Sequence, residues 1–226
     1  MKQRNSRFMN SWRRLGYKLA PYAIQNLMTV VIGAMAIIYI ADGIIGLMGD
    51  VSLISYLEFD RYAIIHSFQI WRAVTFIFIP SGDNILWAIL MMYFYWVIGR
   101  ALEKEFGAFR FNLFYFLGAV LALIAGFITG YTTNSYLNLS LFLAFAIFYP
   151  NFEVRLFFIL PIKVKYMAIV YAIVIGFSFI MYPWQYRIVI LLSLLNVVIF
   201  FWRDFRYVIK TFIQDSKIRF QRWKNQ

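Results

Sequence analysis

The stretch that decides the fold is QIWRAVTF, residues 69–76, in which Trp71 and Arg72 stand side by side between hydrophobic segments. An arginine in such surroundings is expensive unless its loop has a special position at a membrane surface. The surrounding connection, from Asp50 to Asp83, is too long for a simple turn, and aromatic and aliphatic residues interrupt its charges. We therefore expect it to be a long external loop that lies in the membrane interface.

The composition of the whole chain indicates an integral membrane protein. Of 226 residues, 63% are hydrophobic and 14% are charged, which is more apolar side chain than a globule of this size can hide from water. The absence of cysteine excludes disulfides, thiolate catalysis and cysteine-ligated metals. A single histidine, His66, argues against a histidine metal site. We expect neither a metal nor another cofactor.

Six apolar runs reach or approach the roughly 20 helical residues needed to cross the hydrocarbon. We expect helices approximately from Tyr22 to Met48, Ile85 to Gly99, Phe109 to Gly130, Ser135 to Tyr149, Val164 to Tyr182 and Gln185 to Trp202. The second and fourth are short, which fits a place inside a bundle or in a locally thin membrane. The predicted fold is an all-α bundle of six transmembrane helices, forming one domain over residues 22–202.

The net charge of +12 is a topology signal and not a mark of nucleic-acid binding, because the cations collect at both ends and in short loops. Basic segments 1–21 and 203–226 flank the membrane domain, so we expect both termini in the cytoplasm. The tail is predicted to lie as an amphipathic segment on the anionic inner leaflet, where each cation contributes about 1 kcal/mol. A disordered arm and a helix that binds a cytoplasmic partner are the alternatives. The arrangement is compatible with a bacterial inner membrane, and in a eukaryote the endoplasmic reticulum would be the first expectation.

Two further motifs accompany the Trp71-Arg72 pair. GRALEKEFG carries the spacing G-x-x-x-E-x-x-x-G, and FYPN is followed by LFFILPIKVK; their marked residues are Gly99, Glu103, Gly107, Pro150 and Pro161. In this order, and covering roughly residues 71–165, the set resembles the rhomboid superfamily. That superfamily includes intramembrane serine proteases and inactive relatives such as the derlins. The resemblance implies a rhomboid-like bundle with Trp71 and Arg72 positioning the first loop and Glu103 fixing the inner end of helix two.

Each motif also has a simpler interpretation. Trp71 fits an interfacial anchor with Arg72 beside it, and the two glycines fit helix packing and helix ending. Glu103 fits a carboxylate paired with Arg100 or Lys104 at the water surface.

An active rhomboid would need a serine in a G-x-S-G motif on helix four and a histidine on helix six. Counting back from Pro150 places Ser135 at the serine position, but both glycines are missing, and a helix-opening turn residue fits as well. Ser140 is the weaker candidate and fits a packed or back-bonded hydroxyl. Trp87 and Met91 replace the oxyanion-stabilising side chains that the resemblance implies on helix two.

Helix six contains no histidine and no glycine, so both the base and the small-residue face toward helix four are missing. We therefore expect no catalytic residue. An unconventional pair of His66 with Ser135 lies on a common side of the membrane, although a lone interfacial histidine is more often a surface group.

The resulting expectation is a pseudoprotease that binds transmembrane client proteins and locally perturbs the lipid bilayer. In derlins and related pseudoproteases, the resemblance implies that such clients are handed to degradation or trafficking machinery. Two alternatives stay open. One is an intramembrane serine protease acting through Ser135 or Ser140, and the other is a small transporter or channel, for which Asp42 is the only acid clearly within a span.

Overall fold

The computed structural model describes residues 20–49, 52–81, 84–156 and 160–201. Most of the predicted N-terminal basic segment and the whole predicted tail lie outside these residues. The long helices are α2 (Leu27–Met48), α6 (Ile85–Phe106), α7 (Ala108–Thr129), α8 (Ser135–Phe148), α9 (Val164–Met181) and a last helix, Trp184–Phe201. A short 3-10 turn, η1 (Ala20–Tyr22), precedes α2.

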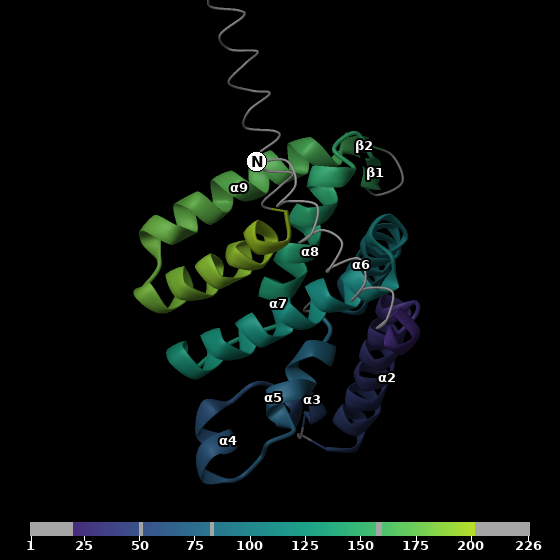
Figure 1. Ribbon diagram of the computed structural model, residues 1–226. Helices are drawn as coiled ribbons and strands as arrows, with labels where there is room; N and C mark the ends of the chain where they lie inside the picture. The colour runs from purple at the N-terminus through teal and green to yellow at the C-terminus, as the bar shows by residue number, and fades with distance from the viewer. Residues whose placement is uncertain (1–19, 50–51, 82–83, 157–159, 202–226) are drawn as a thin grey trace, which may run out of the picture.

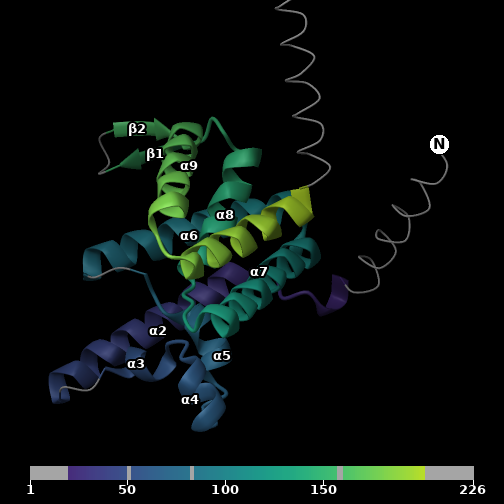
Figure 2. The same cartoon turned by 90° about the vertical axis from the view of Figure 1, so that its left-hand side faces the viewer.

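The chain between α2 and α6, residues 49–84, is called the first loop. It carries four short helical elements: α3 (Leu53–Leu57), α4 (Arg61–His66), α5 (Arg72–Thr75) and the 3-10 turn η2 (Phe76–Phe78). Figures 1 and 2 show these elements grouped at one end of the bundle, with a β-hairpin at the other end. The hairpin pairs β1 (Glu153–Leu156) with β2 (Leu160–Lys163) in antiparallel register, Glu153 opposite Lys163.

Five helices are long and apolar enough to cross a membrane: the stretch Ala20–Met48 that includes α2, then α6, α7, α9 and the last helix. The remaining helix, α8, is apolar but has only 14 residues. The chain is therefore an all-α integral membrane protein, as predicted, and the hairpin is the only β-structure in its described part.

Two helix boundaries and one connection differ from the prediction. The second helix is not short, because α6 continues through the charged segment after Gly99 and ends only where Gly107 adopts a positive φ of 79°. The first helix begins at Leu27 and not at Tyr22, since Asn26 has a left-handed backbone. The connection from helix four to helix five forms the hairpin, which the sequence did not predict.

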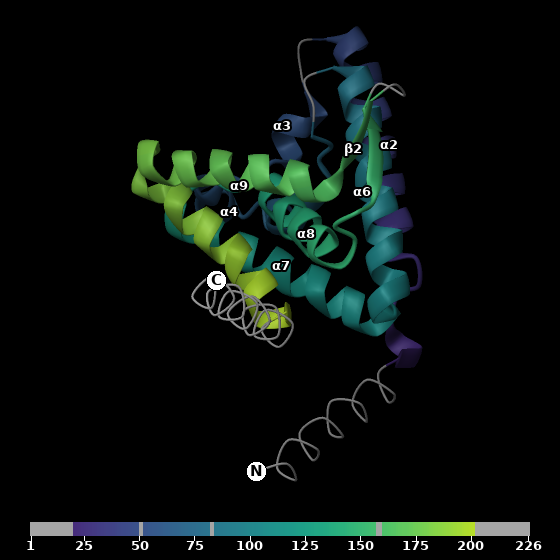
Figure 3. The same cartoon turned by 90° about the horizontal axis from the view of Figure 1, so that it is seen from above.

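Helix α8 occupies the centre of the molecule. Seen from above in Figure 3, it lies between α6, α7 and α9, and it packs against all three. Eight of its 14 residues are buried, although α8 is the shortest of the long helices. The largest fully buried side chains of the core around it are Phe111, Phe114, Phe145, Met28, Ile98, Leu102, Leu137 and Leu141. The prediction that the fourth helix is short and lies within the bundle is thus confirmed.

Helix α9 packs much more loosely. Of its 18 residues only Val164, the first, is buried. Its side contact with the core is aromatic: the rings of Phe142 on α8 and Tyr171 on α9 lie 5.8 Å apart, and Phe94 on α6 lies 6.1 Å from Phe142. Figure 3 shows α9 running away from α6 at a steep angle beyond this contact.

Candidate functional site

Arg72 anchors the first loop. Its side chain is buried, with 7% exposed, and its guanidinium Nη1 donates to the carbonyl oxygens of Ser55 at 2.7 Å and Glu58 at 3.0 Å. The Nε atom donates to the side-chain oxygen of Gln69. Because the carbonyls at a helix C-terminus lack helical partners and carry partial negative charge, the end of α3 accommodates this cation without a carboxylate.

Two neighbours of Arg72 complete the cap on α3. The indole nitrogen of Trp71 donates to the carbonyl of Tyr56 at 3.1 Å, and the hydroxyl of Thr75 donates to the carbonyl of Leu57 at 2.7 Å. Three side chains from one helical turn therefore bind four consecutive carbonyls, those of residues 55–58. The sequence pointed to Trp71 and Arg72 but not to Thr75, whose hydroxyl is common in turns of every kind.

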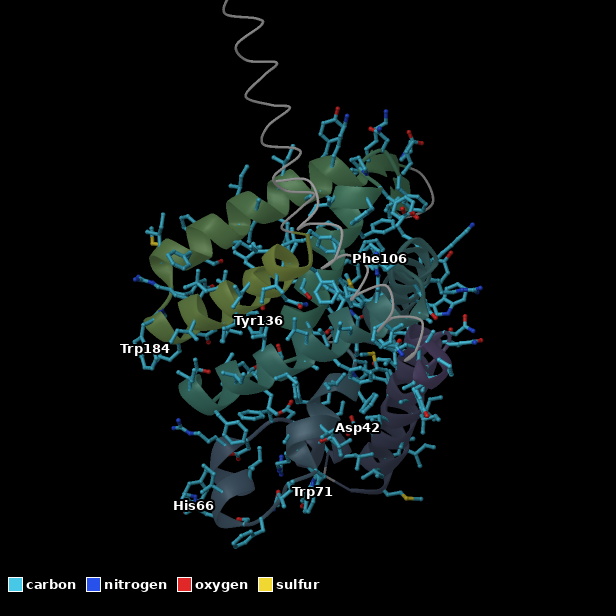
Figure 4. All side chains as sticks on the ribbon, viewed as in Figure 1. Asp42, His66, Trp71, Phe106, Tyr136 and Trp184 are labelled. Carbon is cyan, nitrogen blue, oxygen red and sulfur yellow. The ribbon has the colours of Figure 1, made fainter. Side chains whose placement is uncertain are left out.

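The other end of α3 is held by Asp42 of α2. One carboxylate oxygen of Asp42 accepts from the Ser52 hydroxyl at 2.9 Å and from the backbone N–H of Ile54 at 3.0 Å, which caps the start of α3 from a neighbouring helix. Figure 4 labels Asp42 beside this group of elements. Asp42, the acid that the sequence places within the first span, is thus engaged in holding a helix, which weighs against its use as an ion-transport group.

Glu103 joins the inner ends of α6 and α2. Its Oε1 atom accepts from the backbone N–H of Asn26 at 2.7 Å. It forms no ion pair with Arg100 or Lys104, and the guanidinium of Arg100 lies instead 5.0 Å from the centre of the Trp96 ring. The simpler interpretation of Glu103, a carboxylate paired with an adjacent cation, is therefore not what the structure shows.

The motif glycines and prolines shape the same end of the bundle. A Cβ atom on Gly99 would lie 1.9 Å from Cγ of Met28, so this glycine permits the close contact of α6 with α2. Gly107 forms the turn between α6 and α7. The carbonyl of Pro150 accepts from the N–H of Lys165 at 3.0 Å, and Pro161 lies in β2 opposite Arg155.

Ser135 is the first residue of α8 and is exposed. The start of this helix is anchored by Asn134, whose amide donates to the carbonyls of Ile77 and Ile79 and accepts from the Ser81 hydroxyl at 3.1 Å. Asn134 occupies the N-cap position, but its side chain binds the first loop and makes no cap hydrogen bond to α8. These contacts of Asn134 had no sequence signal beyond its place in a polar turn.

The structure does not bring His66 to Ser135. His66 is exposed on α4 and stacks on Tyr62, with ring centres 4.3 Å apart. Figure 4 places it at the tip of the first loop, well separated from Tyr136, the residue that follows Ser135. The unconventional pair considered from the sequence has no structural support.

Ser140 lies deep in the bundle, with 1% exposed. Its hydroxyl donates to the carbonyl of Leu137 at 2.7 Å and accepts from Nδ2 of Asn196 on the last helix at 3.1 Å. Nδ2 of Asn196 also donates to the carbonyl of Phe114 at 3.4 Å. The hydroxyl of Ser140 binds a backbone carbonyl of its own helix, as one of the two sequence interpretations predicted. Its other partner is the Asn196 amide, which does not accept a proton as a general base does.

The last helix approaches α8 closely although it contains no glycine. The space comes from Gly118 on α7, where a Cβ atom would lie 2.7 Å from Nδ2 of Asn196 and 2.6 Å from a methyl of Leu137. A small residue on α7, and not one on the last helix, therefore makes room for this contact. A lone asparagine in an apolar run is the signal that could have identified Asn196, because interhelical hydrogen bonds commonly use such residues.

Trp87 and Met91 lie in the outer half of α6. The backbone N–H of Trp87 donates to the capping side chain of Asn84 at 2.9 Å, and its ring is partly exposed. Neither residue forms a side-chain hydrogen bond with Ser135 or Ser140. Across the described residues, no group of three or more His, Cys, Asp or Glu side chains is placed to hold a metal ion.

The contacts described above are anchoring contacts. Its charged groups bind helix ends, and its buried serine is hydrogen-bonded to an amide. Comparison of the chain with models of protein families, with curated proteins and with solved structures finds no match.

Proposed function

We propose that the chain is a six-span, rhomboid-like pseudoprotease that binds transmembrane segments of other proteins without cleaving them. The observation that carries this proposal is the hydrogen bond from Asn196 to Ser140. It joins the fourth and last helices. The resemblance implies that these two helices carry the catalytic serine and histidine in an active rhomboid. An amide in place of the base leaves the serine unactivated, and losing base and oxyanion groups together removes most catalytic power.

The ends of the helices support a six-span topology with both termini in the cytoplasm. Glu103 lies at the start of α2, and the hydroxyl of Tyr149 after α8 donates to Glu105 at 3.1 Å, so these ends share one side. The same side carries the cations Arg100, Lys104, Arg110, Lys163 and Lys165. Asp42, Glu58 and Asp60 belong to the opposite end, which the positive-inside rule assigns to the exterior.

The proposed perturbation of the bilayer rests on α8 alone, because α6 is longer than expected. Fourteen residues reach about 21 Å along a helix, against roughly 30 Å of hydrocarbon. The central helix is therefore shorter than the hydrocarbon layer of the surrounding bilayer is thick. The bilayer would thin where its lipids meet α8, at the opening between α6 and α9.

The proposed client site is the lateral opening between α6 and α9. The outer half of α6 exposes Leu86, Trp87 and Tyr93, and α9 exposes Ile173 and Phe177. Between them lies the ring of Phe142 on α8, 6.1 Å from the Phe94 ring on α6 and 5.8 Å from the Tyr171 ring on α9. Helices in lipid associate through close packing and hydrogen bonds more than through hydrophobic force, so a helix that packs loosely on its own chain is free to accept another.

Site-specific photocrosslinking in living cells tests this function. Benzoylphenylalanine is placed at Phe177 on α9, which is 59% exposed, and at Phe116 on α7, which is 46% exposed, as the matched control. We expect discrete protein adducts at position 177 and only lipid adducts at position 116. Equal protein adducts at both positions, or none at position 177, would contradict the lateral site.

A further inference from the structure

A small pocket lies between the first loop and the start of α8. Its cavity volume is about 40 Å³, room for a few water-sized groups, and it opens to solvent. Its floor is apolar, formed by the side chains of Phe59, Phe76 and Ile79. Its rim is polar, formed by Glu58 and by residues 131–134 of the turn between α7 and α8.

The walls of this pocket are fixed from both sides. Asn134 is bonded to the carbonyls of Ile77 and Ile79, and the carbonyl of Glu58 is bonded to Arg72. On α7, a Cβ atom at Gly126 would lie 2.8 Å from both the Phe59 ring and Cγ2 of Thr132. This glycine therefore lets the floor and the rim rest directly on the α7 backbone. A pocket held in this way is preformed.

Two polar groups at the rim have unused binding capacity. Thr132 is 2% exposed, and its buried hydroxyl has no hydrogen-bond partner among the described residues, which is unfavourable for a buried polar group. The Glu58 carboxylate makes no ion pair or hydrogen bond within the described part of the chain. The nearby cation Arg61 uses its Nη1 atom to bind the carbonyl of Phe127 at 3.0 Å, at the end of α7.

The charge of Glu58 acts on the pocket. The pKa of Tyr131, which lies outside the spanning helices, is raised by burial and further by the negative charge of Glu58. Glu58 therefore places a negative charge at the rim, and the floor is aromatic and aliphatic. An anionic ligand is disfavoured by this combination.

We propose that the pocket binds an alkylammonium group, with its apolar stem on Phe59 and Phe76 and its ammonium between the Glu58 carboxylate and the Thr132 hydroxyl. An ammonium has three donors and no acceptor, which suits these two oxygen acceptors. The cavity of about 40 Å³ is far smaller than the roughly 300–1,000 Å³ of typical small-molecule pockets, so it admits only the ammonium and the first carbons of its stem. A free amine and a lysine side chain of a bound membrane client both carry an alkylammonium group. Binding of a client lysine rests on the proposed function.

The absence of cysteine from the chain allows a direct test of the pocket's charge preference. Thr133→Cys places a thiol at the rim, and Ser67→Cys, on the exposed end of α4, is the control. The detergent-purified protein reacts with cationic aminoethyl or anionic sulfonatoethyl methanethiosulfonate, and the rates are compared. We expect the cation-to-anion rate ratio at position 133 to exceed that at position 67 by about tenfold. Glu58→Gln should abolish the excess while keeping the carbonyl that Arg72 binds.

Protection of the thiol then identifies the ligand. We expect n-butylamine, but not n-butanol, to slow labelling at position 133, and Thr132→Val to weaken this protection. Protection by a lysine-bearing transmembrane peptide alone would identify a client lysine as the source. The proposal would be overturned if Glu58→Gln left the cation-to-anion rate ratio unchanged in a protein that unfolds like the parent. Equal protection by n-butylamine and n-butanol would also overturn it. These rates need no client, so failure of client crosslinking at α9 would leave the free-amine site standing.

Discussion

Arg72 shows how a buried cation can be stabilised without an acid. Its guanidinium binds two carbonyls at the end of α3 and the Gln69 amide, so its partners are chiefly backbone atoms. The Trp71-Arg72 pair made this position conspicuous in the sequence. Its partners could not be predicted, because backbone carbonyls leave no residue-specific pattern.

Replacing Arg72 should open the first loop. Arg72→Ala leaves two carbonyls and an amide oxygen without their charged donor, and we expect a loss of about 2 to 3 kcal/mol in the free energy of unfolding. Arg100→Ala, which removes an exposed arginine over Trp96, should lose less than about 1 kcal/mol. Unfolding in SDS, followed by circular dichroism, measures both. Equal losses in the two variants would show that Arg72 is not the anchor.

The Ser140–Asn196 contact offers a second test at the scale of single residues. In Ser140→Ala and Asn196→Ala the interhelical hydrogen bond is lost, and a double-mutant cycle should give a coupling energy of about 0.6 kcal/mol, typical of such bonds in membranes. The same unfolding assay applies. Strictly additive losses would mean that the two side chains do not interact, and the assignment of Asn196 as the partner of Ser140 would fall.

At the scale of elements, the apolar runs predicted which segments form helices better than where the helices end. The end of α6 was missed because the charges of RALEKE lower the hydrophobicity that the prediction relied on, although most of these residues favour helix. The hairpin was missed because a short apolar run such as FFILPI fits a strand or a buried helix equally well. Helix propensity extends α6 to the turn at Gly107, and the pairing of β1 with β2 forms the hairpin.

The packing of α6 against α2 depends on Gly99. A Cβ atom there would lie 1.9 Å from Cγ and 2.6 Å from Cβ of Met28, so Gly99→Ala should lower the free energy of unfolding by about 1 to 3 kcal/mol through overpacking. Gly33→Ala on α2, where an added Cβ meets nothing within 4 Å, is the control and should be neutral or stabilising. Met28→Ala should rescue Gly99→Ala only in part, since Cβ of residue 28 stays. Full rescue or no loss would contradict this geometry.

At the scale of the whole molecule, the helical membrane class was the most predictable feature, and the contacts between helices were the least. Runs of cations and acids pointed to opposite ends of the bundle, and the structure places the start of α2 and the ends of α6 and α8 together. The same sequence could not reveal that Asn196 meets Ser140 or that Asp42 caps α3. Those contacts join residues 56 and 12 positions apart and depend on how helices cross.

The proposal of a pseudoprotease requires that no serine of this chain be activated, and labelling with a fluorophosphonate probe measures this directly. The purified protein would be treated in detergent and in liposomes beside Ser135→Ala, Ser140→Ala and an active intramembrane serine protease. We predict no labelling of the folded protein or of either variant while the control enzyme is labelled. Labelling of the parent protein that disappears in only one of the two variants would contradict the proposal and identify that serine as a nucleophile.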